Sequence, residues 1–141
     1  MTPEELAHIH QVSIETPKPW DAKAFAGFLK DPTVRLLSES GCFLLMRSAA
    51  EEAEILTLAV VPAMRRKGKA FKLLTLAIEE AAITGAKSMF LEVAENNSAA
   101  ISLYEKAKFL RVGVRKNYYR QPNGNRVDAI VMRRSSDLST G

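Results

Sequence analysis

The first feature that can do chemistry is a basic turn around Gly68. The run Arg65-Arg-Lys-Gly68-Lys-Ala70 lies between an apolar segment that stops at Pro62 and a helical pattern. The start of a helix carries unpaired N–H groups and the positive end of the helix dipole, and a glycine lets the backbone approach an anion. The segment predicts a phosphate-binding turn, with a basic loop that merely caps a helix as the alternative. It has neither P-loop spacing nor the full glycine set of a dinucleotide-binding fingerprint.

A carboxylate within an apolar strand is the second candidate. In the segment Met89-Phe-Leu-Glu92-Val-Ala94, the period of two places Glu92 on the same face as Phe90 and Ala94. A strand that follows a crossover helix is covered on both faces, so a carboxylate in its middle is costly unless it is hydrogen-bonded, hydrated or functional. We interpret Glu92 as a candidate general base, with a solvent-facing strand residue as the alternative.

The third candidate is a tyrosine on the helix that follows. Ala100, Leu103 and Tyr104 recur at i, i+3 and i+4, so the Tyr104 side chain should point inward. A phenol with a pKa of ~10 can give its proton to a departing thiolate, whose thiol has a pKa of ~8.5 in water. A tyrosine that fills the core is the other interpretation, and the two roles are compatible.

Helical and strand patterns alternate around these residues. Thr2 and Asp21 are typical helix caps, each followed by an amphipathic pattern, and Pro32 ends the second. The later patterns predict strands 34–37 and 42–46, a loop 49–53, a strand 55–61, a helix 68–84, a strand 88–94, a helix 99–108 and strands 110–120 and 127–133. This order predicts one mixed α/β domain over residues 1–134, with a disordered polar tail over residues 135–141.

Composition limits the class of protein. The chain has 141 residues, 47% of them hydrophobic, and a formal net charge of +4, which fits one domain with a real core. The acidic start is unlike a secretory signal and no apolar stretch approaches the ~20 residues of a membrane span, so we expect a cytoplasmic protein. The single cysteine, Cys42, lies in an apolar run and predicts a buried residue. His8 and His10 cannot share a helix face, so we expect both at the surface and no metal site.

Five separated motifs together resemble the GNAT superfamily of N-acetyltransferases. In order and spacing, over about residues 54–133, they are Leu58-Ala-Val-Val-Pro62, Arg65-x-x-Gly68-x-Ala70, Leu91-Glu-Val93, Asn97-x-x-Ala100-Ile-x-Leu-Tyr104-Glu and Phe109. The chain looks most like the RimI-type ribosomal-protein-alanine (protein N-terminal) acetyltransferases, whose ending is matched by Arg115-Lys-Asn-Tyr-Tyr119, Gly124 and Asp128-Ala-Ile-Val-Met132. The resemblance implies a central, mostly antiparallel sheet with a parallel central pair, flanked by helices.

The resemblance also implies a set of site residues and a reaction. It implies acetyl-coenzyme A as the cofactor, direct attack of an amine on the thioester, Glu92 as base and Tyr104 as acid, with no role for Cys42. The implied cofactor-binding residues are Leu58, Ala59, Val60, Arg65, Arg66, Lys67, Gly68, Lys69, Ala70, Phe71, Asn97 and Tyr104. Trp20, Tyr118 and Tyr119 are implied on the acceptor side, with the filling of a sheet edge as the alternative for the two tyrosines.

The acceptor is the part that the sequence determines least. The turn after Tyr119 is one residue longer than in RimI-type sequences, and Val127 stands where they carry an acidic residue. An α-amine with a pKa of ~7.7–8.0 leaves more neutral amine at pH 7 than lysine at ~10.4, which favours a protein N-terminus. A polyamine or aminoglycoside acceptor stays open, as does a non-catalytic module that binds coenzyme A or RNA. No DNA or membrane partner is expected, and the chain could be a monomer or a homodimer.

Overall fold

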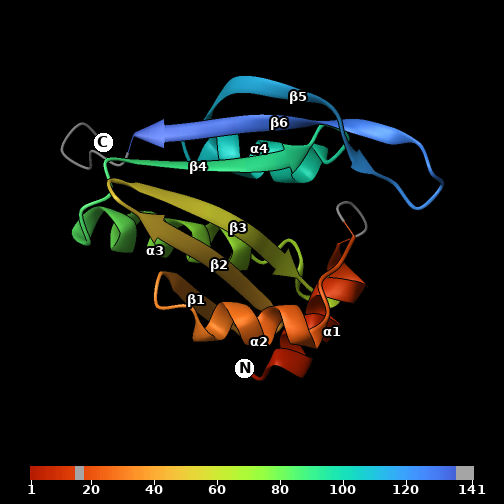
Figure 1. The fold of residues 1–141 in the computed structure, drawn as a ribbon, viewed down its shortest axis with the longest axis horizontal. Coiled ribbons are helices and arrows are strands. Elements are labelled where there is room, and N and C mark those ends of the chain that lie inside the picture. Colours follow the sequence, from red (N-terminus) through yellow and green to blue (C-terminus); the bar gives the residue numbers. More distant parts are fainter. Residues whose placement is uncertain (15–17, 136–141) are drawn as a thin grey trace.

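A six-stranded mixed sheet with helices on both faces organises the residues that the structure describes, 1–14 and 18–135 (Figure 1). In this computed structural model the strand order is β1-β2-β3-β4-β6-β5, and neighbouring strands are antiparallel except β3 and β4. The predicted fold class, a mostly antiparallel sheet with a parallel central pair, is therefore confirmed. None of the helices in these two ranges is long and apolar enough to span a bilayer.

Two N-terminal helices begin at the caps that the sequence predicts. They are α1 (Pro3–Ser13) and α2 (Ala22–Lys30). The side chains of Thr2 and Asp21 each accept a hydrogen bond from the backbone N–H three residues later, at 3.1 and 2.9 Å. Both helices cover one face of the β1–β3 part of the sheet, over a cluster that contains the fully buried Phe25.

Three strands follow as an antiparallel meander: β1 (Val34–Glu39), β2 (Cys42–Ala49) and β3 (Glu52–Val60). The predicted loop over residues 49–53 is too long, since β3 already begins at Glu52. Polar residues at the end of a strand can still pair through their backbone. Leu56 is an extra residue in β3, since the pairing of β3 with β2 skips it. This bulge lies just beyond the segment of β3 that pairs with β4.

The parallel pair of strands is short and then splits. The 3-10 turn η1 (Pro62–Met64) and the basic turn lead from β3 into α3 (Lys69–Ile83), and β4 (Ser88–Ala94) follows. β4 pairs with β3 only over residues 52–54 and 88–90, and the two strands then separate toward their carboxyl ends (Figure 1). The split opens the middle of the sheet at the edge where ligands commonly bind in sheets with parallel strands.

The C-terminal part adds α4 (Ser98–Lys106), β5 (Leu110–Arg120) and β6 (Arg126–Ser135), with β6 inserted between β4 and β5. Ser135 is the last residue of β6 and pairs with the first residue of β4. The predicted disordered tail therefore starts one residue too early, and its remainder, residues 136–141, lies outside the described residues.

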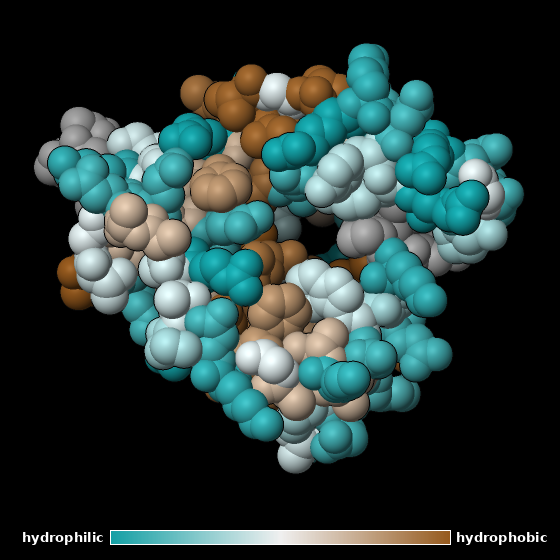
Figure 2. Space-filling model, viewed as in Figure 1, coloured by the Kyte–Doolittle hydropathy of each residue, from teal (hydrophilic) through white to brown (hydrophobic). Residues whose placement is uncertain are grey.

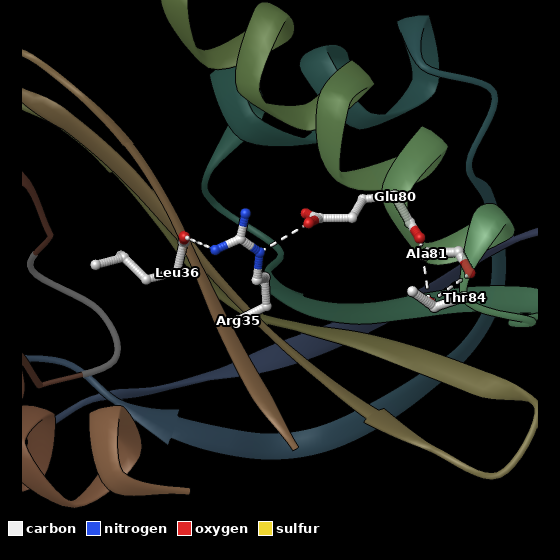
Figure 3. Close-up of polar contacts among 5 residues, drawn as sticks. All are labelled: Arg35, Leu36, Glu80, Ala81 and Thr84. Atoms are coloured by element: carbon white, nitrogen blue, oxygen red, sulfur yellow. Dashed lines mark hydrogen bonds and ion pairs between the residues drawn. The ribbon is translucent and has the colours of Figure 1, made fainter. Parts of the chain in front are cut away.

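The helices α3 and α4 cover the opposite face, where their apolar sides enclose the larger core cluster. Cys42 is fully buried there, as predicted, and burial together with the charge of Glu39 raises the pKa of its thiol to about 11. At the sheet edge, Arg35 Nε donates to Glu80 Oε1 at 2.7 Å and ties β1 to α3 (Figure 3). Thr84 Oγ1 lies 3.1 Å from the Glu80 carbonyl oxygen in the last turn of α3.

The prediction that both histidines lie at the surface is right for His8 and wrong for His10. His10 is 1% exposed, because it stands one helical turn after the buried Leu6 on the apolar side of α1. Its Nδ1 accepts a hydrogen bond from the Trp20 N–H at 2.9 Å, and its Nε2 lies 2.9 Å from Thr57 Oγ1. Burial lowers the pKa of His10 from 6.5 to about 4, so the neutral ring serves as a structural link.

Candidate active site

The basic turn has the geometry of an anion cradle. Gly68 adopts a left-handed backbone with φ of 75° immediately before α3, and Arg66 is also left-handed at 63°. The start of α3 has no side-chain cap, so its first N–H groups are available to a ligand. A Cβ at Gly68 would meet no heavy atom within 4 Å, which shows that the space above the turn is open.

A groove of about 630 Å³ extends from this turn between β3, α3 and α4. Of the predicted cofactor residues, those that line it are Leu58, Ala59, Val60, Arg65, Arg66, Gly68, Lys69, Ala70, Phe71, Asn97 and Tyr104. Lys67 does not line the groove. The structure thus brings to one place the residues from three separate sequence segments, which is the arrangement that a long, phosphate-containing cofactor requires.

Asn97 and Arg65 have structural contacts as well as a place in the groove. Asn97 caps α4, where its side chain accepts a hydrogen bond from the Ala100 N–H at 3.2 Å. The Arg65 guanidinium donates to the backbone carbonyls of Val60 (3.3 Å) and Ser13 (3.0 Å). Arg65 therefore joins the end of α1 to the end of β3, and the charge nearest the ligand space falls to other residues of the turn.

Tyr104 lies deep in the groove wall. It is 7% exposed, and its ring contacts Phe109 edge-on with the centroids 5.9 Å apart. Burial, with a smaller contribution from the nearby Tyr119, raises the pKa of the Tyr104 phenol. A phenol in this state keeps its proton until a strong base appears beside it, as a thiolate leaving group would.

Glu92 occupies the outer face of the sheet, which we define as the face opposite α3 and α4. The strand alternation places its neighbours Leu91 and Val93 in the core beneath those helices. The Glu92 side chain is 18% exposed and its Oε1 lies 3.0 Å from Arg115 Nε of β5. Partial burial was expected from the sequence, whereas the arginine partner was not. Glu92 is not part of the groove lining and lies on β4, two residues after the last residue that pairs with β3.

Tyr118 and Tyr119 gather on the side of Glu92. Their rings lie 5.1 Å apart, and the Arg115 guanidinium carbon lies 5.4 Å from the Tyr118 ring centre. Burial and the negative charge of Glu92 raise the pKa of Tyr119. Asp128 fixes the irregular stretch of β5 before these tyrosines, because its carboxylate accepts the Asn117 N–H at 2.8 Å. Tyr119 also adds a small upward shift to the pKa of Tyr104.

Trp20 does not reach the groove. Its ring packs against His10 and Phe28, with centroids 5.0 and 4.9 Å apart, in the cluster beneath α1 and α2. The Trp20 ring thus supports the N-terminal helices, and its predicted place on the acceptor side stays a prediction.

A sequence comparison decides the family. The model of the acetyltransferase (GNAT) family matches residues 19–109. The chain belongs to this family. Acetyl-coenzyme A is the cofactor of GNAT acetyltransferases, and the predicted superfamily, transferase class and cofactor are confirmed at this level.

Individual GNAT relatives agree with the assignment. The chain is 35% identical over 118 residues to the [ribosomal protein bS18]-alanine N-acetyltransferase of Escherichia coli K12, covering 81% of this chain and 79% of that protein. It is 38% identical over 90 residues to the protein of the same name from Haemophilus ducreyi, covering 64% of this chain and 62% of that one. The crystal structure of the E. coli ribosomal-protein-S18-alanine N-acetyltransferase superposes with a TM-score of 0.83 at 32% identity, covering 94% of this chain and 86% of that chain.

The GNAT cofactor fits the chemistry of the groove. The open cradle at Gly68 and the first turn of α3 suit a pyrophosphate, and the apolar wall from Leu58 and Val60 suits a pantetheine arm. Lys106 of α4, which the sequence did not single out, adds a cation to the groove wall and lies with its Nζ 4.4 Å from the Phe71 ring centre. No family motif in the sequence marks Lys106, and only the packing of α4 against α3 places it there.

Proposed function

We propose that this GNAT acetyltransferase acetylates the α-amine of a protein N-terminus, an alanine of a ribosomal protein, by direct attack in a ternary complex. The observation that supports this proposal most strongly is the split between β3 and β4. A buried phenol, Tyr104, faces the groove on one side of the split, and a carboxylate, Glu92, stands on the other. The choice of acceptor is supported by the names of the two curated relatives and by the share of each chain that aligns with this one.

The residues of this chain divide the work of the reaction. Bound acetyl-coenzyme A supplies an activated acetyl thioester. The Gly68 turn and the first amides of α3 hold the pyrophosphate, and a backbone N–H near Val60 stabilises the developing oxyanion. Glu92 accepts the proton of the attacking amine, and Tyr104 donates its proton to the departing thiolate. Holding amine and thioester together supplies much of the acceleration, because the reaction then becomes effectively unimolecular.

The choice of an α-amine over a small amine rests on two supports. An α-amine titrates near the working pH, so a single carboxylate base is sufficient for its deprotonation. A hollow on the outer face also suits a chain end, and Figure 2, seen from the side of α1 and α2, shows it between these helices and the β5–β6 hairpin. A cytoplasmic location accompanies this proposal, because newly made ribosomal proteins are found there.

A direct assay tests the proposed function. The purified protein is incubated with acetyl-coenzyme A and with peptides that begin with alanine, serine or methionine and contain one internal lysine. Free thiol and peptide mass are recorded, and N-terminally blocked copies of each peptide serve as controls. We expect acetylation at the α-amine, fastest for alanine, and none of the blocked peptides. Turnover of spermidine or of the internal lysine, with no α-amine product, would show that the acceptor is a different amine.

A further inference from the structure

Glu54 is a second carboxylate on the outer face, and neither the family motifs nor the proposed mechanism uses it. It is the last residue of β3 that pairs with β4, opposite Phe90. Paired residues of neighbouring strands point to the same face, and Glu92 stands two positions after Phe90 on that face. The negative charge of Glu92 also raises the pKa of the Glu54 carboxyl, so the two side chains lie near each other. Glu54 and Glu92 therefore flank the point where the strands split.

The three arginines around Glu54 on the outer face already have carboxylate partners. The ion pairs nearest to Glu54 are Arg47 with Asp31 (3.6 Å), Arg133 with Glu52 (2.8 Å) and Arg115 with Glu92 (3.0 Å). The side chain of Glu54 has no ion-pair or hydrogen-bond partner among residues 1–14 and 18–135. Two carboxylates beside one guanidinium leave one negative charge without a balancing cation.

The environment of Glu54 shows that this charge is poorly compensated. Burial is the main cause that raises the pKa of the Glu54 carboxyl, and the negative charge of Glu92 raises it further. Arg47 and Arg115 act in the opposite direction but do not cancel this increase. Tyr119 stands close enough for both carboxylates to raise the pKa of its phenol. A half-buried carboxylate that lacks a partner is favourable only if a cation or a proton joins it.

We propose that Glu54 and Glu92 together bind the ammonium group of the incoming acceptor, and that Glu54 is the specificity-determining residue that selects a cationic amine. This inference rests on the proposed function and deepens it. One ammonium beside two carboxylates and the Arg115 guanidinium gives a neutral cluster. Glu92 then takes the proton, while Glu54 holds the amine in place. The acetylated product is an uncharged amide, so it loses this attraction and dissociates.

Glu54→Gln tests the proposal with a side chain of the same shape and no charge. We expect the KM for an alanine-starting peptide to rise by roughly tenfold or more, the loss typical of removing one partner of a close charge pair. The KM for acetyl-coenzyme A should stay unchanged and kcat should change less than about threefold. Glu52→Gln is the matched control, because Glu52 lies two residues earlier on the same face and pairs with Arg133. It should leave both KM values unchanged.

A binding measurement separates recognition of the ammonium from a merely structural role. Calorimetry with the coenzyme A complex compares an alanine-starting peptide with the same peptide acetylated at its N-terminus. The wild type should prefer the free amine by about tenfold or more, and Glu54→Gln should lose most of this preference. An unchanged preference and an unchanged peptide KM in Glu54→Gln would overturn the proposal.

The proposed function and the ammonium site can fail separately. If the wild type acetylates alanine-starting peptides but Glu54→Gln behaves like it, only the ammonium site is wrong. If the wild type acetylates spermidine and no peptide, the proposed function is wrong. The KM for spermidine is then measured for the wild type, Glu54→Gln and Glu52→Gln. A tenfold KM effect of Glu54→Gln on spermidine would support the ammonium site, and equal KM values would overturn it.

Discussion

The groove between α3 and α4 and the outer face beside Glu92 offer a ligand different kinds of contact. The groove offers backbone amides, a left-handed glycine and apolar walls, mostly from the continuous stretch of residues 58–71. The outer face offers side-chain charges from β3, β4 and β5, which meet only in the folded sheet. Backbone recognition tolerates change in most side chains, whereas recognition by charge changes with a single substitution. In the proposed function, the first region holds the cofactor and the second selects the amine that reacts.

The largest expected effect is at the cofactor turn. Gly68→Asp should abolish detectable binding of coenzyme A, a loss of about 10²-fold or more in Kd, because it adds negative charge where the phosphates lie. Calorimetry with coenzyme A measures this. Gly85→Asp is a matched control, since Gly85 is also left-handed, with φ of 104°, and its Cβ would likewise meet no atom within 4 Å. Equal affinities of the two variants for coenzyme A would show that the phosphates do not bind at this turn.

The next effect separates chemistry on the outer face from cofactor binding in the groove. Glu92→Gln should lower kcat by about 10²-fold, as expected for removal of a general base, with the Kd for coenzyme A unchanged. Steady-state kinetics and calorimetry on the same preparation supply both numbers. Glu79→Gln on the exposed side of α3 serves as the control. A kcat within threefold of the wild type would assign the proton transfer to another group.

Tyr104 tests whether the groove also contributes to the chemistry. Tyr104→Phe removes only the hydroxyl and keeps the ring contact with Phe109, so we expect kcat to fall by roughly 10²-fold while the melting temperature changes little. Thiol release at saturating acetyl-coenzyme A measures the rate, and thermal unfolding checks the fold. A normal rate with a lowered melting temperature would make Tyr104 a packing residue only.

The smallest expected effect concerns the support of the outer face by α1. Because His10 has a pKa of about 4 when folded and 6.5 otherwise, the unfolded chain binds more protons between these values. Its contribution to stability is therefore complete above pH 6.5 and is lost as the pH falls toward 4. The free energy of unfolding should drop by about 1 kcal/mol between pH 7.5 and 5.5 from this group alone.

Urea unfolding at several pH values measures this linkage. Protonation of His10 would place a hydrogen on Nδ1, the nitrogen that accepts from the Trp20 N–H. His10→Gln cannot titrate, so it should remove that part of the slope. The same slope in His10→Gln and wild type would show that other groups cause the acid sensitivity.

Local sequence patterns predicted most of the fold because each element carries its own signals. The caps Thr2 and Asp21, the glycine before α3 and the period of two in β4 all appear as predicted. The errors fall where tertiary contacts override such signals. His10 is polar by type yet buried by its position on α1, and polar residues at the ends of β3 and β6 join the sheet through their backbone.

The candidate site was predicted unevenly for the same reason. The residues that line the groove were found because their motifs are short and continuous, and Glu92 stood out as a charge in an apolar strand. Lys106 and Glu54 were missed, since each looks like an ordinary charge on an amphipathic element. Trp20 packs under the N-terminal helices, and its role on the acceptor side stays a prediction.

By itself the sequence determined the order of elements, the anion-binding turn and the family, because these depend on local backbone preferences and on motifs within a few residues. Only the tertiary structure decided which charges meet on the outer face. The ladder between β3 and β4 is three residues long, and it ends at Glu54 and Phe90, so Glu54 and Glu92 lie diagonally across the start of the split. The pairing of β6 between β4 and β5 then brings Arg115 to them. Such encounters follow from strand register, which no single stretch of sequence specifies.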